Sequence, residues 1–134
     1  MSEIDQALVN SNVIIDIIGQ DAHWMSWSMN TLSQYEQTFV NPLVFSGLCY
    51  LRPSVVEVEE VLASLDLGYA ELPKDTLFLA AQAYTHYHQR GGMKNAPLVD
   101  FLIGAHAAAL GVPILTRDVG RYQAYFPMVT LISP

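Results

Sequence analysis

The sequence predicts one α/β domain, a three-layer α/β/α sandwich built around a parallel sheet of four or five strands. Short apolar runs typical of buried strands alternate along the chain with longer segments typical of helices. Hydrophobic residues make up 51% of the chain and charged residues 14%, which suits strands that are covered on both faces. Neither a repeat nor a linker divides residues 1–134, so we expect a single domain.

The expected elements follow from apolar runs and from the residues that punctuate them. Strands are expected at 7–9, 38–40, 69–72, 113–116 and 129–132. Helices are expected over 21–36, from 41 onward, from 53 to a stop at Gly68, and over 75–89, 98–110 and 119–125. Residues 13–18 suit either a short helix or further strand, because their periodicity fits both. In the segment 98–110, small residues predict a helix that lies close to its neighbours.

Polar residues follow two of the expected strands. Asn10, Ser11 and Asn12 come after the first strand, and Thr116, Arg117 and Asp118 come after a later one. The carboxyl ends of parallel strands meet at one edge of a sheet, and binding and chemistry collect there. The sequence therefore places its candidate site at this edge.

Charge is distributed unevenly along the chain. The formal net charge of −7 and the pI of about 4.7 argue against a protein that coats nucleic acid generally. The last third is nevertheless locally basic, and its residues Lys94, Arg117 and Arg121 are the candidate nucleic-acid contacts. They suit ordinary solvated charges equally well.

The expected compartment is the cytoplasm. Cys49 is the sole cysteine, so the chain forms no internal disulfide, which suits a reducing environment. The first residues lack the positive charge and apolar run of a secretory signal. No apolar stretch reaches the roughly 18 residues of a membrane span, so we expect no membrane association.

Four segments resemble, in the same order, parts of PIN-domain ribonucleases of the VapC toxin type. They are Val9-Asn10-Ser11-Asn12-Val13-Ile14-Ile15-Asp16, Asn41-Pro42-Leu43-Val44-Phe45, the helix 98–107, and Ile114-Leu115-Thr116-Arg117-Asp118 with the residues up to Pro127. The resemblance implies a PIN-like fold and an endoribonuclease that depends on Mg²⁺ or Mn²⁺. It also implies RNA as substrate, a small antitoxin protein as partner, and a homodimer.

The resemblance further implies four acidic residues that together hold one or two hard cations, which prefer oxygen ligands. Asp100 and Asp118 match the third and fourth acids, and Thr116 supplies the hydroxyl beside the fourth. Asn10 stands where the first acid is expected, and Gly47 stands where the second is expected. The candidate catalytic residues are therefore Asp100, Asp118, Asn10 and Thr116, with Asp100 and Asp118 as metal ligands.

Several of these residue types have a structural explanation as well. Asp100 and Asp118 both suit caps at helix starts. His86 and His88 stand two apart on a helix and point in different directions, so we interpret them as surface residues. His106 lies on the small-residue helix, where we expect a hydrogen bond within the core.

Two functions of different classes follow. The first is a metal-dependent endoribonuclease toxin, a phosphodiester hydrolase. The second is a catalytically silent PIN-fold module that binds RNA or a protein partner. The substitutions at 10 and 47 leave a formal charge of about −2 in place of −4, which weakens the attraction for a divalent cation. The sequence leaves open whether the protein is an enzyme.

Overall fold

The central sheet contains five parallel strands. A computed structural model describes residues 5–93 and 96–134, with the backbone alone for Arg121. The strands are β1 (Gln6–Val9), β2 (Gln37–Val40), β3 (Leu67–Tyr69), β4 (Ile114–Leu115) and β5 (Leu131–Ile132). Their order is β3-β2-β1-β4-β5, and every pairing is parallel. The predicted parallel sheet is confirmed, and it has five strands, the larger of the two predicted numbers.

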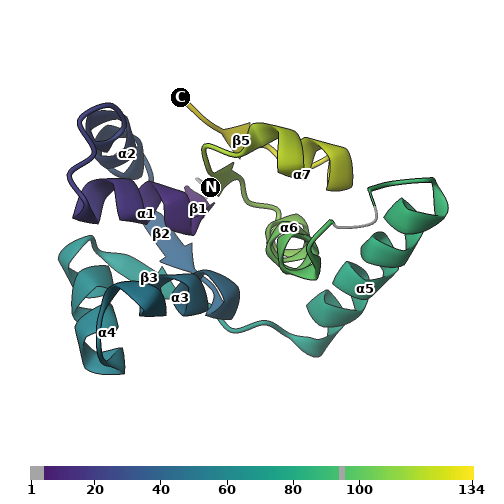
Figure 1. Cartoon of the computed structure of the whole chain (residues 1–134), viewed down its shortest axis with the longest axis horizontal. Helices are drawn as coiled ribbons and strands as arrows, with labels where there is room; N and C mark the ends of the chain where they lie inside the picture. Colours follow the sequence, from purple (N-terminus) through teal and green to yellow (C-terminus); the bar gives the residue numbers. More distant parts are fainter. Residues whose placement is uncertain (1–4, 94–95) are drawn as a thin grey trace, which may run out of the picture.

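Seven helices surround the sheet in the described part of the chain. They are α1 (Ser11–Ile18), α2 (Met25–Leu32), α3 (Pro42–Leu48), α4 (Val55–Ser64), α5 (Lys74–Gln89), α6 (Leu98–Leu110) and α7 (Val119–Tyr125), with a 3₁₀ turn at Cys49–Leu51. Helices α1 and α2 pack together, as do α5 and α6, and Figure 1 shows these two pairs on different sides of the molecule. The three-layer α/β/α arrangement is confirmed. Between 5 and 93 and between 96 and 134, no helix is long and apolar enough to cross a bilayer.

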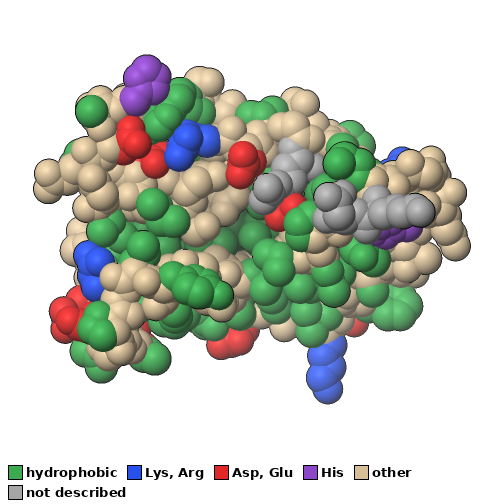
Figure 2. All heavy atoms as spheres, viewed as in Figure 1, with side chains coloured by type: hydrophobic (Ala, Val, Ile, Leu, Met, Phe, Trp, Pro, Cys, Tyr) green, Lys and Arg blue, Asp and Glu red, His purple; other side chains and the backbone are tan. Residues whose placement is uncertain are grey.

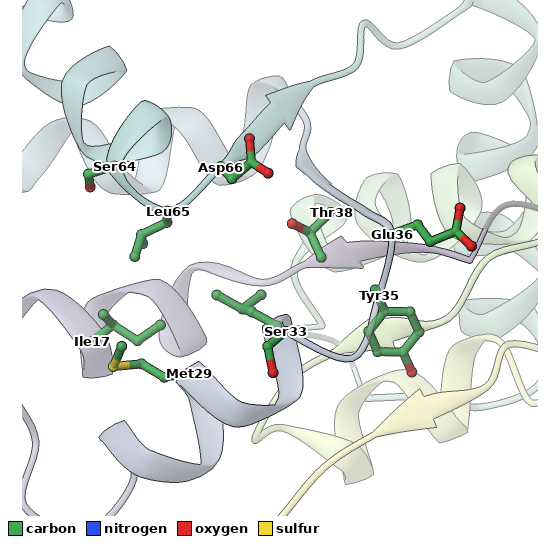
Figure 3. A pocket seen from close by; sticks show the side chains of 10 residues that line it. Ile17, Met29, Ser33, Tyr35, Glu36, Thr38, Ser64, Leu65 and Asp66 are labelled. Carbon is green, nitrogen blue, oxygen red and sulfur yellow. The ribbon is translucent and has the colours of Figure 1, made fainter.

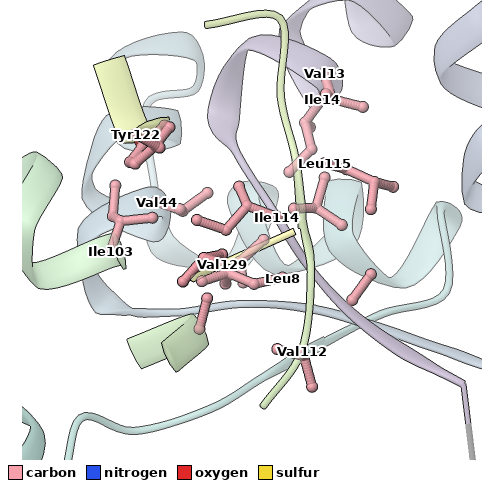
Figure 4. Close-up of a cluster of buried hydrophobic side chains, with 14 of the residues drawn as sticks. Leu8, Val13, Ile14, Val44, Ile103, Val112, Ile114, Leu115, Tyr122 and Val129 are labelled. Carbon is pink, nitrogen blue, oxygen red and sulfur yellow. The ribbon is translucent and has the colours of Figure 1, made fainter. Parts of the chain in front are cut away.

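The hydrophobic core is centred on the two middle strands. The β1 side chains Ala7, Leu8 and Val9 are fully buried, as are Ile114 and Leu115 of β4. Figure 4 shows Leu8 and both β4 side chains among residues from α1, α3, α6 and α7. Each aliphatic side chain buried in this way contributes about 1.5–3 kcal/mol. Strands β1 and β4 therefore run through the most deeply buried part of the molecule, and the chain emerges from it where they end.

Helix α1 resolves the ambiguity of residues 13–18. Asn10 has an extended backbone (φ −74°, ψ 153°) and caps the helix, because its side chain accepts a hydrogen bond from the Ser11 N–H. Val13 and Ile14 are then buried against the core, while Ile15 is partly exposed. A cap at the strand end, rather than periodicity, starts the helix.

The boundary between α4 and β3 corrects one expectation. The sequence predicts a helix up to Gly68 and a strand over 69–72, whereas α4 ends at Ser64 and β3 covers Leu67–Tyr69. The chain turns at Asp66, which has a left-handed backbone (φ 56°). Gly68 then pairs with Phe39 of β2. The glycine is part of the edge strand, and an aspartate makes the turn because Asp tolerates this conformation better than most residues.

Close packing of α6 depends on one glycine. A Cβ atom at Gly104 would lie 2.3 Å from the ring of Phe126, far inside contact distance. The Phe126 ring therefore occupies a slot that only glycine leaves open. The expectation that small residues allow close approach holds here at the contact between α6 and the end of α7.

Candidate functional site at the carboxyl edge of the sheet

The ends of β1 and β4 bring two of the candidate residues together. The strands pair in parallel with Val9 opposite Leu115, so Asn10 and Thr116 leave the sheet side by side. Asn10 Nδ2 donates to Thr116 Oγ1 at 3.2 Å, although the two residues are 106 positions apart in sequence. The topology thus joins Asn10 and Thr116 at the edge where the sequence places the site.

The orientation of the Asn10 amide decides the character of this site. Its Oδ1 accepts from the Ser11 N–H at 2.7 Å, and because a backbone N–H only donates, this atom must be the oxygen. The amide nitrogen therefore points the other way, donating to Thr116 Oγ1 and to the Tyr122 hydroxyl at 2.9 Å. Asn10 is 7% exposed. Its oxygen serves as a helix cap, and its donors face the other site residues.

Asn12 links α1 to the loop that follows β4. Its Nδ2 donates to Thr116 Oγ1 at 3.2 Å and to Asp118 Oδ2 at 3.4 Å, and its Oδ1 accepts from the Arg117 N–H at 3.3 Å. Thr116 Oγ1 also accepts from the Asp118 N–H at 3.0 Å. The buried Thr116 hydroxyl is therefore the common acceptor of three donors. This network fixes Asp118, whose side chain is exposed, at the start of α7.

Arg117 forms an ion pair within the chain. Its Nε donates to Asp16 Oδ2 at 2.7 Å and its second terminal nitrogen to Asp16 Oδ1 at 3.0 Å, the fork geometry that makes such pairs strong. The guanidinium also lies 5.4 Å from the centre of the Trp24 ring. Arg117 therefore has an internal partner that the sequence did not reveal. Of the other predicted nucleic-acid contacts, Lys94 and the side chain of Arg121 lie outside the described residues.

The path of helix α6 directs Asp100 toward the carboxyl edge of the sheet, the edge that also carries Asp118. Helix α6 has 13 residues and is therefore about 20 Å long. It ends at Leu110, shortly before the chain enters β4 from the amino edge, so its first turn with Asp100 lies toward the carboxyl edge. The Asp100 side chain is 3% exposed. Helix α6 also contacts α3, which contains Gly47, and α7, which begins directly after Asp118.

Gly47 faces the site without contributing to it. A Cβ atom at this position would lie 3.6 Å from Ser11 Oγ and 3.7 Å from Ser11 Cβ, which are ordinary contact distances. Ser11 is the neighbour of Asn10 and the first residue of α1. Position 47 therefore points at the start of α1 and has room for the first atom of a side chain.

This donor set does not fit a Mg²⁺ or Mn²⁺ ion. Over residues 5–93 and 96–134, no three Asp, Glu, His or Cys side chains lie close enough to share a metal. The Asn10 amide directs hydrogens, not oxygen lone pairs, toward Thr116 and Tyr122. The nearby carboxylate of Asp16 is held by Arg117. Hard cations need several oxygen ligands, whereas Asn10, Asn12 and Thr116 use their polar atoms on one another and on the backbone.

His106 makes the core hydrogen bond that the sequence predicts, at the same edge of the sheet. Its Nδ1 lies 3.2 Å from Asn41 Nδ2, and Asn41 in turn caps α3 by accepting from the Val44 N–H at 3.0 Å. Burial lowers the pKa of His106 below its ordinary value, because the charged imidazolium is poorly solvated there. The interpretation of His86 as a surface residue is confirmed, whereas His88 is half-buried beside Tyr84.

The contact of Tyr122 with Asn10 and the pairing of Arg117 with Asp16 were not predicted from the sequence. Asn12 stands within the polar run after the first strand, which was a usable signal. Tyr122 reaches Asn10 across 112 positions, and Arg117 reaches Asp16 across 101. No spacing rule connects residues so far apart, so these contacts required the fold.

Comparison with known proteins places the fold in the PIN-like class. No protein-family model and no protein of curated function matches the sequence. Among solved structures, the chain resembles a chain of VapBC2 from Rickettsia felis bound to a promoter DNA fragment, with a TM-score of 0.73, 16% identity, and coverage of 96% of this chain and 98% of that one. The likeness at this identity is one of fold.

Two further structures agree. DNA-bound VapBC from Salmonella typhimurium gives a TM-score of 0.71 at 14% identity, covering 97% of this chain and 98% of that one. FitAcB from Neisseria gonorrhoeae gives 0.70 at 17%, covering 96% and 97%. The chain therefore spans nearly the whole of each matched fold. Its architecture is that of the PIN-like chains found in VapBC toxin–antitoxin complexes.

Proposed function

We propose that this protein is a PIN-fold relative of toxin–antitoxin toxins that acts by binding a partner protein, without cleaving RNA. The orientation of the Asn10 amide carries this proposal. Its oxygen is used by the Ser11 N–H and its hydrogens are directed at Thr116 and Tyr122, so the position supplies no ligand for a catalytic cation. Gly47 removes a second carboxylate that the resemblance implies.

The surface supports a protein partner over a nucleic acid. The chain has a net charge of −7, and its Arg117 guanidinium is paired with Asp16. Apolar side chains are exposed, including Phe78 at 66% on α5. Figure 2 shows hydrophobic side chains gathered below and to the right of its centre, where Figure 1 places α6 and α5. Continuous apolar surface of this kind is typical of protein-binding sites.

Two protein partners follow from the proposal. One is a small antitoxin, since the similar structures carry VapBC and FitAcB in their names. The other is a second copy of the chain, since Thr76 to Gln89 on α5 contains no Asp, Glu, Lys or Arg that would repel a copy. Sedimentation should show a dimer that Phe78→Glu converts to a monomer. We also place the protein in the cytoplasm, where the exposed Cys49 stays reduced.

One observation favours the competing function, an endoribonuclease that uses Mg²⁺ or Mn²⁺. Asp100 and Asp118 are both retained, and the path of α6 directs Asp100 toward the edge that carries Asp118. In that function these two acids would be the metal ligands, with Asn10 and Thr116 beside them. RNA would then be the substrate.

An RNA cleavage assay separates the two functions. The purified chain is incubated with structured RNA and Mg²⁺ or Mn²⁺, with the Asp100→Asn, Asp118→Asn double variant as the control for contaminating nuclease. We expect the chain and the control to give equal, background cleavage. Cleavage by the unaltered chain that the control lacks would overturn the proposal and establish the nuclease.

Calorimetry with Mn²⁺ gives an independent measure. The unaltered chain should show no tight Mn²⁺ binding, because its pocket offers few free oxygen ligands. The Asn10→Asp, Gly47→Glu double variant should bind Mn²⁺, because it adds two carboxylates in positions that face Ser11 and Thr116. Tight binding by the unaltered chain would contradict a silent site.

A further inference from the structure

Helix α3 begins at a buried amide that also contacts α6. The Asn41 Oδ1 accepts from the Val44 N–H at 3.0 Å, and because a backbone N–H only donates, this atom must be the oxygen. The amide nitrogen of Asn41 is therefore the atom that lies 3.2 Å from Nδ1 of His106. The exposed fractions of the two residues are 0% for Asn41 and 1% for His106. One side chain thus joins the cap of α3 to the middle of α6.

This contact fixes the tautomer of His106. An amide nitrogen only donates, so Nδ1 of His106 accepts with its lone pair, and Nε2 carries the proton of the neutral ring. A further proton can therefore enter only at Nδ1. It would face a hydrogen of the Asn41 amide, donor against donor, at a place where both residues are buried. The protonated ring is thus incompatible with the contact as it stands.

Within the described residues, no acid favours the protonated form of His106. Burial alone lowers the pKa of this imidazole below its ordinary value. Strands β1, β2 and β4 and helix α3 contain no titratable side chain. Asp100, the acid on α6 itself, lies six residues earlier, which is about 9 Å along the helix.

Helices α5 and α7, which contact α6, carry titratable groups that are engaged elsewhere. On α5, Lys74, Asp75 and His86 are exposed. The other groups belong to the aromatic cluster around Phe101 (Tyr84, Tyr87, His88 and Tyr125) or contact Asn10 (Tyr122), and the side chain of Arg121 lies outside the described residues.

We propose that Asn41 and His106 form a proton-operated latch, which holds the first turn of α3 on α6 and releases it in acid. A proton on His106 Nδ1 is accommodated when the Asn41 amide turns over and presents Oδ1 to the imidazolium. The same movement takes this oxygen away from the Val44 N–H, so α3 loses its cap. Helix α3 has seven residues, and short helices depend strongly on their ends.

Release of α3 would reach the candidate site. Helix α3 also contacts α1, and position 47 faces Ser11 in the first turn of α1. Figure 1 shows α3 between α4 and α6, so it forms one wall beside the carboxyl edge. The latch would therefore make the packing of this wall depend on pH, without a change at Asn10 or Thr116. It goes beyond the proposed function, because it operates whether or not the protein cleaves RNA.

Amide hydrogen exchange of the full ¹⁵N-labelled chain, followed by NMR from about pH 7.5 to about pH 5, tests the latch. After correction for the intrinsic exchange rate, protection of the Val44 amide should fall about fivefold in acid, as expected for a lost helix cap. The Ser11 amide is the internal control, because its cap, Asn10, faces hydroxyl groups that take up no proton in this range. Protection at Ser11, and at the Ile114 amide in the sheet, should stay constant.

Two substitutions remove the latch in different ways. His106→Asn keeps an acceptor oxygen near the place of Nδ1 but does not titrate, so protection at Val44 should no longer depend on pH. Asn41→Asp caps α3 with one oxygen and accepts from His106 Nδ1 with the other, so acid should again leave Val44 protected. His86→Gln, at an exposed histidine of α5, is the matched control and should keep the fivefold fall.

Long-range ¹H–¹⁵N spectra of the imidazole read the tautomer directly. The unaltered chain should carry its ring proton on Nε2 of His106 at about pH 7.5, and Asn41→Asp should move it to Nδ1. A proton on Nδ1 in the unaltered chain would overturn the proposal, as would constant protection at Val44 or equal falls at Val44 and Ile114. A fall at Val44 that persists in His106→Asn would also overturn it; if that variant does not fold, the same fall in Asn41→Asp decides.

Discussion

The two edges of the sheet hold buried hydroxyl groups in opposite states. At the carboxyl edge, Thr116 is fully buried and accepts from Asn10, Asn12 and the Asp118 N–H. At the amino edge, Thr38 is almost as deeply buried, and its hydroxyl lines a groove beside Glu36 and Asp66 (Figure 3), with no hydrogen bond from the described residues. A threonine side chain is thus hydrogen-bonded within the chain at one edge, whereas at the other its hydroxyl lines an open groove.

This difference indicates which edge can bind a ligand without first losing a hydrogen bond within the chain. A saturated network gains little from a ligand, because any new contact must replace one that exists. A hydroxyl that lines an open groove can exchange water for a ligand without breaking a hydrogen bond within the chain. The position where the resemblance implies catalysis is therefore the less receptive of the two.

The largest expected effect is at the saturated edge. Asn10→Ala should lower the free energy of unfolding by about 3 kcal/mol, since it removes a helix cap worth about 1 kcal/mol and two further hydrogen bonds of similar worth. Urea denaturation measures the loss. Asn30→Ala, at an exposed position on α2, is the control and should change stability little. A loss at Asn10 as small as that control would show that the network does not hold this edge.

Arg117→Ala should come next, with a loss of about 2 kcal/mol. The substitution leaves the Asp16 carboxylate, which is 3% exposed, without its ion-pair partner. Adding Asp16→Asn should restore much of the loss, because the stranded charge is then removed. If the double variant is no better than Arg117→Ala, the ion pair is not the source of the effect, and contact with Trp24 becomes the explanation.

Thr38→Val should have a smaller effect of the opposite sign. Replacing a hydroxyl that makes no hydrogen bond within the described residues with a methyl group of similar size should leave stability unchanged or raise it by about 0.5 kcal/mol. Thr116→Val is the matched comparison, and it should cost about 1 kcal/mol or more because three donors lose their acceptor. Equal effects of the two substitutions, measured by urea denaturation, would remove the distinction between the edges.

The smallest expected effect is on the pH dependence of stability. Burial lowers the pKa of His106 in the folded state below its ordinary value of 6.5, so the unfolded chain binds protons first as the pH falls. Stability should therefore decline as the pH drops below about 6.5 toward the folded-state pKa. His106→Gln should flatten this decline between about pH 7 and 5, since the variant lacks the imidazole whose pKa differs between the folded and unfolded states. Identical slopes would show that His106 is not held neutral.

Much of the fold could be predicted from the sequence, because most elements carry local signals such as capping residues and prolines. Asn41 and Pro42 predicted the start of α3 through cap and proline preferences, and both are found in those positions. The Gly68 boundary was misread because glycine usually marks an end, whereas here the turn is made by Asp66 and the glycine belongs to β3. Local signals fail where two residue types compete for the same role.

The candidate site could be predicted only in part from the sequence. Asn10, Thr116 and Asp118 follow strands that the sequence predicts, and parallel topology alone brings strand ends together. The contact of Asn10 with Tyr122 could not be predicted, because Tyr122 owes its position to the packing of α7. The direction of the Asn10 amide follows from a single backbone N–H, which no residue pattern encodes.

A substitution at Gly104 would affect the carboxyl edge of the sheet although position 104 does not contact the site residues there. Phe126, which fills the slot, follows directly after the last residue of α7, and its backbone N–H donates to the Tyr122 carbonyl at 2.8 Å. We expect any side chain at 104 to displace that ring, and through this backbone hydrogen bond to disturb the contact of Tyr122 with the Asn10 amide. A missing methyl group on α6 thus leaves room for the packing beside the hydrogen bond that joins the cap of α1 to α7.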